Sequence, residues 1–533
     1  MNHLYFKSIT VFAAGVISPT IHSIAQNKNS PNILFIMTDQ QRWDAMQCAG
    51  NLEIKTPNMD RIAREGVQFM NAYSACPVSV PARTAILTGR TIFNNKVLDN
   101  NAVESDSVPK FQTFDQVLAA NGYRTEYYGK WHSPYQFASK YKNEVKTTNK
   151  DKHAPNVKSN VEAFREYLTK FYGEARKPVE GELTDFMSLR PYKALEVDGR
   201  FGQVQNFEPN GRPSKSNGDS QANNIGIFNS APDASLTAFE GHEALEALKA
   251  IPVDQPFSLT CSFGPPHPPF VIPKEYADKY DKDQLSVPLS ISDNLANAPY
   301  SHSNQAADAR FKNPEMAKQL KWIYYAMVTQ VDEWVGKLLD ELDRKGIANN
   351  TLVVFVSDHG ELLGDHGLVS KNKMYEGSAH VPMLMRYPKV IPAGRKVETP
   401  VSHHDIFATI LDYTRMKAPK NDGRSLRKLI EEKKDTVNYA VSVWGAIQNG
   451  GPFMIRQGEW KMIVYLQMND KKQKLPNALY NLKTDPLEIN NLIGTNPEKG
   501  NYIKQAESLR QTLKWWMIKT NTPYIIQLQN TKL

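Results

Sequence analysis

Three continuous apolar runs of the sequence predict strands that are buried on both faces, as in a parallel sheet. They cover residues 31–39, 256–263 and 351–359. Polar side chains end or closely follow the runs, namely Asp39, His267, and the pair Asp358 and His359. We therefore expect functional groups at the ends of these strands.

Segments with apolar residues at helical spacing lie between the runs. They cover residues 58–66, 81–87, 114–120, 235–250 and 314–342. Strands that alternate with helices predict an α/β fold, with a mainly parallel sheet and helices on both of its faces. Because ligands bind at the carboxyl ends of the strands in such sheets, the polar strand ends predict where the functional site lies.

Two regions depart from this alternation. Residues 133–229 are polar and weakly periodic, and we expect them to form surface loops inserted near the site. After about Arg424 the pattern predicts shorter strands and a terminal helix, over residues 439–444, 454–465 and 502–518. We expect a main domain at 26–424 and a smaller C-terminal α+β subdomain at 425–533.

Residues 1–25 have the pattern of a secretory signal peptide. Lys7 supplies a positive charge, residues 8–17 an apolar stretch, and Ser23 to Ala25 a small-x-small cleavage site. No cysteine lies near that site to carry a lipid, and no later window reaches the roughly eighteen apolar residues of a membrane span. We expect export by the secretion machinery and no stable membrane anchor.

The composition, 41% hydrophobic and 23% charged over 533 residues, is that of a folded globular protein. Removal of Lys7 with the signal peptide would lower the formal charge from +8 to +7, an excess that suits an anionic substrate. No long block of Lys or Arg marks a nucleic-acid surface. The three cysteines, Cys48, Cys76 and Cys261, do not indicate a disulfide framework.

The segment from Ser79 to Arg83, Ser-Val-Pro-Ala-Arg, indicates the chemistry. A Ser-x-Pro-x-Arg pattern by itself would occur by chance in about one chain of this length in ten. Here it lies at the start of a predicted helix and is followed by Thr88-Gly89-Arg90. In these features the sequence resembles the formylglycine-dependent sulfatases of serine type, which belong to the alkaline phosphatase superfamily.

Further segments resemble blocks of that family and occur in the family order. They are Asp39-Gln40, Gly129 to His132, Pro266 to Pro268, Ser357 to Gly360, Gly364 to Gly367 with Lys371, Tyr375-Glu376 with Val381-Pro382, and Leu479 to Leu482 with Asp485-Pro486. The resemblance extends over most of the chain after the predicted signal peptide. It implies an alkaline-phosphatase-like fold and an enzyme that hydrolyses sulfate esters.

The resemblance also implies that Ser79 is a precursor. An unmodified serine is a weak nucleophile unless a base activates it. A maturation enzyme able to oxidise serine would convert Ser79 to formylglycine, whose hydrated aldehyde carries two hydroxyls. One hydroxyl would attack sulfur and displace the alcohol, and the second would then lose its proton and expel sulfate.

A bound cation would lower the pKa of such a diol, and the resemblance implies its ligands, which are Asp39, Gln40, Ser79, Asp358 and His359. Oxygen donors favour calcium or magnesium, whereas the histidine leaves a transition metal open. We expect calcium from the resemblance. Many relatives have a second aspartate where Gln40 stands, so this amide offers an oxygen but no charge.

The remaining site residues would bind the sulfate group and move protons. Arg83 would fix and polarise the diol, while Lys130 and Lys371 would neutralise the sulfate oxygens. His132 would assist breakdown of the covalent intermediate. Either His267 or Lys371 would protonate the leaving alcohol, and the sequence does not choose between them.

Two rival functions stay open. One is a phosphonate monoester or phosphodiester hydrolase, because that group resembles this sequence in its Asp-Gln start, its Asp-His-Gly block and its formylglycine. The other is a non-catalytic polysaccharide-binding protein in which Ser79 stays unmodified. The serine motif together with export predicts a bacterial periplasm and a sulfated carbohydrate substrate. Outside the site, we expect His403 and His404 to be structural and Lys373 to be solvated.

Overall fold

The computed structural model describes residues 30–104, 109–135, 145–147, 167, 225–228, 232–268, 270–300, 310–434, 437–444, 451–466 and 476–533. The predicted signal peptide at 1–25 and most of the predicted insertion at 133–229 lie outside the described residues. Within the part that is described, no helix has both the length and the apolar character needed to cross a membrane.

An eight-stranded sheet with the order β11-β2-β10-β9-β1-β7-β4-β5 forms the centre of the molecule. Its strands are β1 (Asn32–Thr38), β2 (Val67–Phe69), β4 (Arg124–Gly129), β5 (Val145–Thr147), β7 (Phe257–Phe263), β9 (Thr351–Ser357), β10 (Met383–Arg386) and β11 (Arg395–Val397). Within this sheet, β10 runs antiparallel to both of its neighbours, and the other pairs are parallel.

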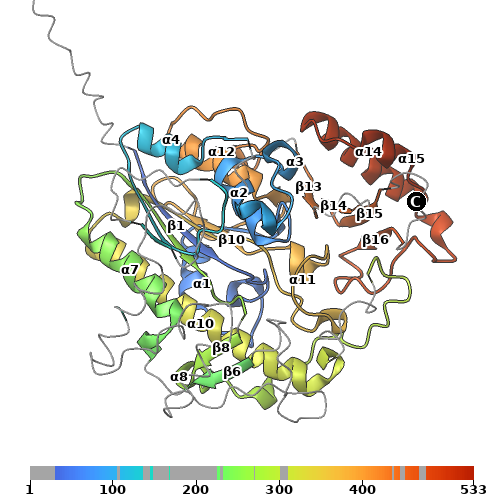
Figure 1. Cartoon of the computed structure of the whole chain (residues 1–533), viewed down its shortest axis with the longest axis horizontal. Coiled ribbons are helices and arrows are strands. Elements are labelled where there is room, and N and C mark those ends of the chain that lie inside the picture. The colour runs from blue at the N-terminus through green and yellow to red at the C-terminus, as the bar shows by residue number, and fades with distance from the viewer. Residues whose placement is uncertain are drawn as a thin grey trace, which may run out of the picture.

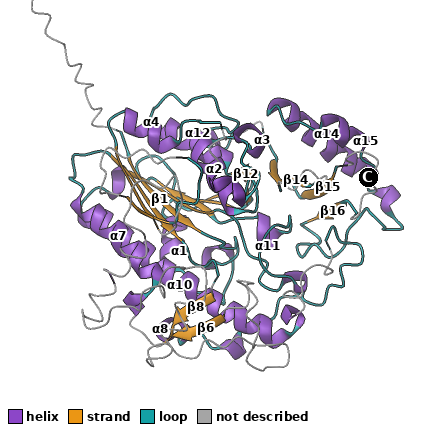
Figure 2. Cartoon of the chain, viewed as in Figure 1, coloured by secondary structure: helices purple, strands orange, loops and turns teal. Residues whose placement is uncertain are grey.

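Helices cover both faces of the sheet (Figure 1 and Figure 2). One face packs on α1 (Pro57–Arg64), α7 (Leu236–Ala250) and α10 (Pro314–Arg344), and the other on α2 (Ser79–Thr88), α4 (Phe114–Ala120), α12 (His404–Tyr413) and α13 (Arg427–Glu432). Successive strand residues point to opposite faces, so Leu34 and Ile36 pack in the first layer and Ile33 and Phe35 in the second. The predicted α/β fold with a mainly parallel sheet is confirmed.

A second, antiparallel sheet forms the C-terminal part of the chain. It contains β13 (Ala440–Val443), β14 (Pro452–Gln457), β15 (Trp460–Tyr465) and β16 (Ala478–Asn481), and is followed by α14 (Ile503–Lys519) and α15 (Ile525–Asn530). The prediction of one strand over 454–465 is wrong. The chain reverses at Gly458, whose positive φ of 55° suits a tight turn, so β14 and β15 pair as a hairpin.

The two faces of the C-terminal sheet have different partners. One face packs on α14 and on α3 (Ile92–Asn95). Residues of the other face, among them Met454 and Tyr480, pack on side chains of the segment 362–379, which ends in α11 (Glu376–Ala379). The C-terminal sheet therefore supports a long loop of the main domain that begins just after β9.

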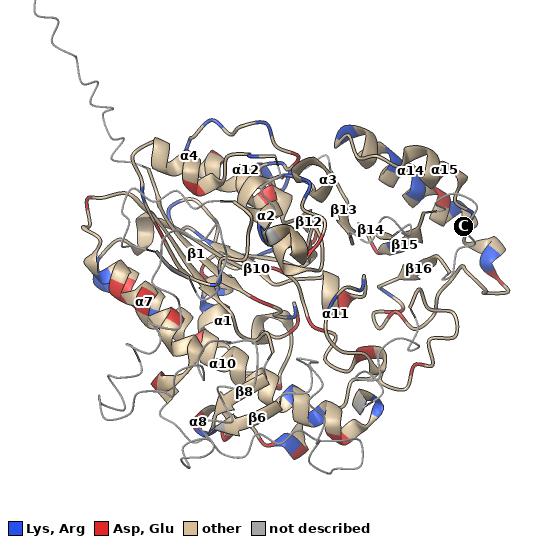
Figure 3. Cartoon of the chain, viewed as in Figure 1, with Lys and Arg blue, Asp and Glu red and all other residues tan. Residues whose placement is uncertain are grey.

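Smaller elements complete the described chain. Two strand pairs lie outside the main sheet, β3 (Ala72–Tyr73) with β12 (Val401–Ser402) and β6 (Ile225–Phe228) with β8 (Phe270–Pro273), and α8 (Lys274–Ala277) follows β8. The three cysteines are free thiols. Acidic and basic positions lie on the same helices, as α7 and α14 illustrate in Figure 3.

Candidate active site

Four neighbouring parallel strands end at one edge of the main sheet, in the order β9, β1, β7 and β4. Side chains of the predicted site follow them: Asp39 after β1, Lys130 and His132 after β4, His267 after β7, and Asp358 and His359 after β9. The apolar runs predicted three of these strands but not β4. The structure therefore brings together residues that are far apart in the sequence.

Ser79 joins this group from α2. It is the first residue of the helix and is only 1% exposed. Its Oγ lies 3.1 Å from Nε2 of His359 and 3.4 Å from Oδ2 of Asp39. Arg83 lies four residues later, on the same face of the helix. The spacing of Ser-x-Pro-x-Arg therefore presents both side chains to the strand ends.

The guanidinium of Arg83 is fully buried and ties the strand ends together. Its Nε donates to Oδ2 of Asp358 at 2.8 Å, and its Nη2 donates to Oδ2 of Asp39 at 3.2 Å. Its Nη1 donates to the carbonyl oxygen of Lys130 at 2.8 Å. Burial opposes the charge, but Asp358 and Asp39 raise the pKa of Arg83, so the guanidinium stays protonated.

Asp39, Asp358 and His359 form a buried group whose ligand atoms lie within 4.8 Å of one another. Among the described residues, Oδ1 of Asp39 is buried and accepts no hydrogen bond. Burial lowers the pKa of His359 to about 4, so its ring is neutral at neutral pH and keeps a lone pair for a ligand bond. Two carboxylates, an imidazole and the nearby Ser79 oxygen fit a divalent cation.

Positive charge surrounds Asp39. Nζ of Lys130 lies 2.6 Å from its Oδ2. Burial alone would raise the pKa of Asp39, but the positive charges around it, that of Lys130 first and then those of Lys371 and Arg83, hold it well below its ordinary value. The site therefore combines an ionised carboxylate with several cations, an arrangement that suits the oxygens of an anionic substrate.

Lys371 reaches the site from the loop after β9. Its Nζ donates to Oε1 of Gln40 at 2.9 Å. Burial, together with the ammonium of Lys130, lowers the pKa of Lys371 to about 8. The side chain is therefore mostly protonated at neutral pH and lies close to the point where it begins to release its proton.

Two histidines, His267 and His132, also belong to the site. His267 is 8% exposed, and its Nε2 lies 4.0 Å from Oδ1 of Asp39. Burial and the ammonium groups of Lys371 and Lys130 hold the pKa of His267 well below its ordinary value. Burial and Lys130 do the same for the pKa of His132, which is half-buried. Both rings are neutral at neutral pH and can accept a proton.

The structure adds Glu361 to the residues that sequence reasoning found. This side chain is fully buried, and burial raises its pKa. It contacts Gln40, whose amide lies between Glu361 and Lys371. In the sequence, Glu361 is only an acidic residue three positions after Asp358. Nothing in the sequence distinguishes it from a surface glutamate.

The structure also tests two expectations made outside the site. Lys373 is only 8% exposed, so the prediction that it is solvated is wrong. His403 lies 3.0 Å from the carbonyl oxygen of Ser357, whereas His404 lies 2.9 Å from Oγ of Ser402. The two rings therefore contact different parts of the fold, which agrees with a structural role.

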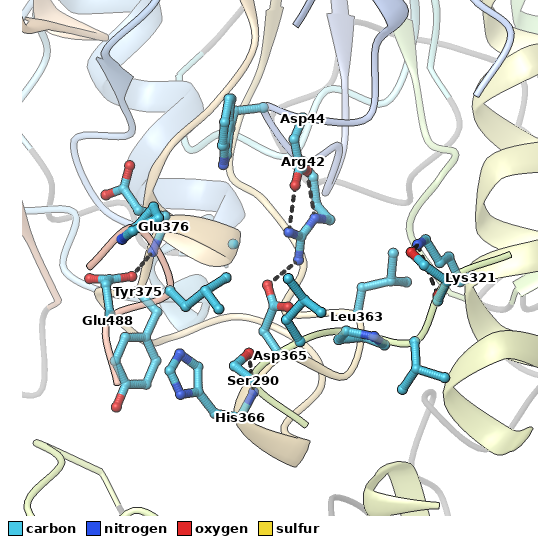
Figure 4. A pocket seen from close by; sticks show the side chains of 18 of the residues that line it. Arg42, Asp44, Ser290, Lys321, Leu363, Asp365, His366, Tyr375, Glu376 and Glu488 are labelled. Atoms are coloured by element: carbon cyan, nitrogen blue, oxygen red, sulfur yellow. Dashed lines mark hydrogen bonds and ion pairs between the residues drawn. The ribbon is translucent and has the colours of Figure 1, made fainter. Parts of the chain in front are cut away.

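A separate cavity of about 270 Å³ lies beneath the loop that follows β9 (Figure 4). Arg42 lies between Asp44 and Asp365 in its wall, at 2.7 Å from an oxygen of each. Nη1 of Arg42 also donates to the carbonyl oxygens of Glu361 and Leu362 at 3.0 and 2.9 Å. Arg42 therefore holds the backbone of this loop by hydrogen bonds.

A sequence profile of the family described as Sulfatase matches residues 31–416, which is more than half of the chain. The chain belongs to the sulfatase family. A second profile, described as N-sulphoglucosamine sulphohydrolase, C-terminal, matches residues 364–515. The expected family is confirmed, and this sulfatase is a sulfuric ester hydrolase.

Curated relatives match the sulfatase along most of their length. An N-acetylglucosamine-6-O-sulfatase of Bacteroides thetaiotaomicron is 28% identical, over 91% of this chain and 86% of its own. An arylsulfatase of Clostridium perfringens is also 28% identical, over 91% of this chain and 93% of its own.

Solved structures share the fold. One, of a protein in complex with its substrate D-glucosamine-2-N,6-O-disulfate, has a TM-score of 0.65 at 22% identity and covers 93% of this sulfatase and 99% of its own chain. Another, of the phosphonate monoester hydrolase of Agrobacterium radiobacter, has a TM-score of 0.67 at 22% identity and covers 90% of this sulfatase and 96% of its own chain. These likenesses confirm the alkaline-phosphatase-like fold.

Proposed function

We propose that this sulfatase hydrolyses sulfate esters of carbohydrates, with a formylglycine made from Ser79 as nucleophile and calcium as the bound cation. One observation carries the proposal. The Oγ of Ser79 lies against His359 and Asp39, and Asp39 in turn contacts Arg83 and Lys130. Cation ligands and sulfate-binding charges thus converge on the residue that the motif selects.

The carbohydrate substrate is supported by the relatives. The curated Bacteroides relative is named for N-acetylglucosamine-6-O-sulfate chemistry, and a protein of the same fold was solved with a glucosamine disulfate. The profile of the C-terminal half is likewise named for a sulphoglucosamine hydrolase. Sulfated amino sugars therefore belong in any first substrate screen.

The proposed modification and cation fit the residues that are present. Hydrated formylglycine would supply the nucleophilic hydroxyl that serine lacks, and calcium would supply positive charge that favours its ionised form. Asp39, Asp358, His359 and the oxygen at position 79 would hold the ion, which fits the buried Oδ1 of Asp39 that accepts no hydrogen bond in the described structure. Gln40 is the weakest proposed ligand, because its Oε1 already accepts from Lys371.

The other side chains would act on the sulfate group and on protons. Arg83 would orient the nucleophile, and the ammonium groups of Lys130 and Lys371 would bind the sulfate oxygens, where negative charge develops. Neutral His132 would accept the proton whose removal allows sulfate to leave. Either Lys371 or His267, the latter once it has taken up a proton, would protonate the departing alcohol.

The proposal includes two partners and a compartment. A serine-competent maturation enzyme would oxidise Ser79, and the secretion machinery would export the chain by its N-terminal segment. A bacterial periplasm is supported by the sequence of residues 1–25 and by the bacterial source of the Bacteroides relative. Fractionation of cells that express the full chain tests this, and a cytoplasmic protein with residues 1–25 intact would contradict it.

The central experiment co-expresses the chain with a serine-competent maturation enzyme. Mass spectrometry of the Ser79 peptide should show the loss of two hydrogens, and the mature protein should release sulfate from a panel of sulfated mono- and disaccharides. Ser79→Ala is the matched control and should be inactive. A mature protein without desulfation activity on any substrate of the panel would refute the proposal.

Rates on aryl sulfate and aryl phosphonate esters compare the main proposal with its closest rival. We expect the sulfate ester to have the higher kcat/KM. A preference for the phosphonate ester would favour a phosphonate monoester hydrolase, whose fold this chain shares. Persistent unmodified serine and no turnover on either ester would favour a polysaccharide-binding role.

A further inference from the structure

The amide of Gln40 lies between two charged groups. Gln40 follows Asp39 at the end of β1 and is 1% exposed, with a positive φ of 70° that few residues other than glycine adopt. Its Nε2 donates to Oε2 of Glu361, and its Oε1 accepts from Nζ of Lys371 at 2.9 Å. The two ends of an amide differ, since one donates and the other accepts. Glu361 therefore determines which end faces Lys371.

Glu361 is itself held so that it cannot exchange its two oxygens. Its Oε1 accepts from the backbone N–H groups of Leu363, at 3.1 Å, and of Ser370. Only Oε2 is left for Gln40. Arg42, which Figure 4 labels, donates from Nη1 to the backbone carbonyl oxygen of Glu361 at 3.0 Å. The carboxylate is thus a rigid acceptor for three donors.

The same carboxylate reaches Lys371 by a second route. Ser370, whose N–H it binds, directly precedes Lys371 in the chain. Glu361 therefore holds both the backbone next to Lys371 and, through the amide of Gln40, its ammonium group. Hydrogen bonds of this kind orient the functional groups that they support.

We propose that Glu361 is a positioning residue that acts through Gln40 to aim the ammonium of Lys371 at the sulfate group. The inference rests on the proposed function, because it assigns a partner to the sulfate-binding role of Lys371. One N–H of the ammonium is used by Gln40, which sets the direction of the others. Gln40 is then a hydrogen-bond bridge from Glu361 to Lys371.

The first test is Glu361→Gln. The new side chain keeps Oε1 on the N–H groups of Leu363 and Ser370, so its NH₂ group faces the NH₂ group of Gln40. Two donors repel, and the amide of Gln40 must turn and present an N–H to the Lys371 ammonium. We expect kcat to fall about 10- to 100-fold, with KM changed less than about threefold.

A charge exchange provides the rescue. In the double variant Glu361→Gln with Gln40→Glu, the new glutamine donates to one oxygen of the new carboxylate, and the other oxygen again accepts from Lys371. The charge of the pair is unchanged. Gln40→Glu alone places two carboxylates against each other and should also lower kcat. We expect the double variant to exceed both single variants, a recovery that loss of packing would not produce.

Asp332→Asn is the matched control. Asp332 is another fully buried carboxylate that accepts backbone N–H groups, those of Asn58 and Met59, at 3.1 and 2.7 Å. These contacts join α10 to α1 and involve none of the proposed site residues. This variant should keep kcat within about twofold of the unsubstituted protein.

Two binding measurements complete the test. Calorimetry with calcium should give similar affinities for the unsubstituted protein and Glu361→Gln, since no ligand carboxylate is changed. Titration of the calcium-loaded proteins with inorganic sulfate should show weaker binding for each single variant and recovery in the double variant. Unchanged kcat in Glu361→Gln, no recovery in the double variant, or a loss of calcium affinity that accounts for the lost activity would overturn the proposal.

The two proposals can fail separately. If the mature, unsubstituted protein releases sulfate from no ester, the proposed function fails. The order of sulfate affinities among the four proteins still decides whether Glu361 positions Lys371. If the protein desulfates sugars but the variants behave like Asp332→Asn, the function stands and the positioning role is excluded.

Discussion

Asp39 lies at the centre of the buried charges, with Oδ2 bound to Lys130 and Arg83 and Oδ1 turned toward His359 and His267. A buried carboxylate oxygen without a hydrogen bond is costly, because it has lost its water and gained nothing in exchange. Its Oδ1 therefore gains most from a bound cation. Asp358 shares the cluster, but both of its oxygens accept hydrogen bonds, Oδ1 from the backbone N–H groups of Gln40 and His359 and Oδ2 from Nε of Arg83.

Asp358→Asn removes a charged ligand from this cluster. We expect the affinity for calcium to fall about 100-fold or more, and activity to fall with it. Titration of the metal-stripped protein with calcium and with manganese measures the loss and shows which ion binds more tightly. Asp332→Asn serves as control and should bind like the unsubstituted protein. Equal affinities in both variants would remove Asp358 from the cation site.

The proton donor to the leaving alcohol can be identified with two substrates. A general acid matters for an alkyl sulfate, whose alcohol leaves poorly, and matters little for nitrophenyl sulfate, whose phenolate leaves without a proton. In the variant that removes the acid, Lys371→Ala or His267→Ala, kcat should fall about 100-fold on the alkyl ester and much less on the aryl ester. The other variant should lose the same factor on both. If each of the two variants lost the same factor in kcat on the alkyl and the aryl ester, neither residue would be the proton donor.

The site residues differ in how far the sequence could reveal them. Short motifs with fixed spacing contain four of them, namely Ser79, Arg83, Asp39 and Asp358. Their chemical roles could therefore be predicted from the sequence. The role of Glu361 could not, because its importance comes from contact with Gln40, which lies 321 positions earlier. No local pattern encodes such a pair. The same holds for the burial of Lys373, since charge alone suggested solvent.

Among the elements, those that are apolar on both faces were predictable. β1, β7 and β9 are entirely buried, and their sequences are nearly continuous apolar runs. β4 is also largely buried, but it contains Thr125 and Glu126, of which Glu126 is only 1% exposed. Because of these polar residues, the search for continuous apolar runs did not predict β4 as a strand. β10 was missed for another reason, because it is only four residues long.

A buried charge cluster joins two elements from different parts of the molecule. Lys461 of β15 is fully buried, and its Nζ lies 2.7 Å from Glu376 of α11 and 2.8 Å from Glu488. It is the cation between two carboxylates that would otherwise repel. Since α11 ends the segment 362–379, the cluster fixes the C-terminal sheet to the loop that carries Lys371.

Lys461→Met should therefore destabilise the protein strongly. Two buried carboxylates would remain without their cation, and we expect the free energy of unfolding to fall by about 3 to 5 kcal/mol. Urea unfolding measures the change. Adding Glu488→Gln to Lys461→Met removes one of the carboxylates and should recover part of the loss. An unchanged unfolding midpoint in Lys461→Met would mean that the cluster does not stabilise the fold.

For the whole molecule, stability should depend on pH through His403. Burial lowers the pKa of His403 to about 3, and its Nδ1 accepts from the N–H of Ala75 at 3.4 Å while its Nε2 lies 3.0 Å from the carbonyl of Ser357. The neutral ring satisfies both contacts. A proton on Nδ1 would face the N–H of Ala75, so the folded protein resists protonation.

The lowered pKa of His403 determines the direction in which the stability of the folded protein changes with pH. The unfolded chain binds a proton near the ordinary histidine pKa of about 6.5 and the folded protein does not, so this stabilisation is present above that value and is lost as the pH falls toward 3. Between pH 7 and pH 5 we expect a loss of about 2 kcal/mol from this group. Unfolding of His403→Gln across that range should show a flatter profile. An identical slope would contradict the prediction.

The burial of Ser79 limits when this side chain could be modified. Ser79 is the first residue of α2 and is 1% exposed. In the folded protein its side chain is therefore not accessible to another enzyme. An enzyme that modifies this side chain would therefore have to act before the chain folds. If Ser79 is converted to formylglycine as proposed, the order of the two events decides activity, and a copy that folds before conversion would keep an ordinary serine.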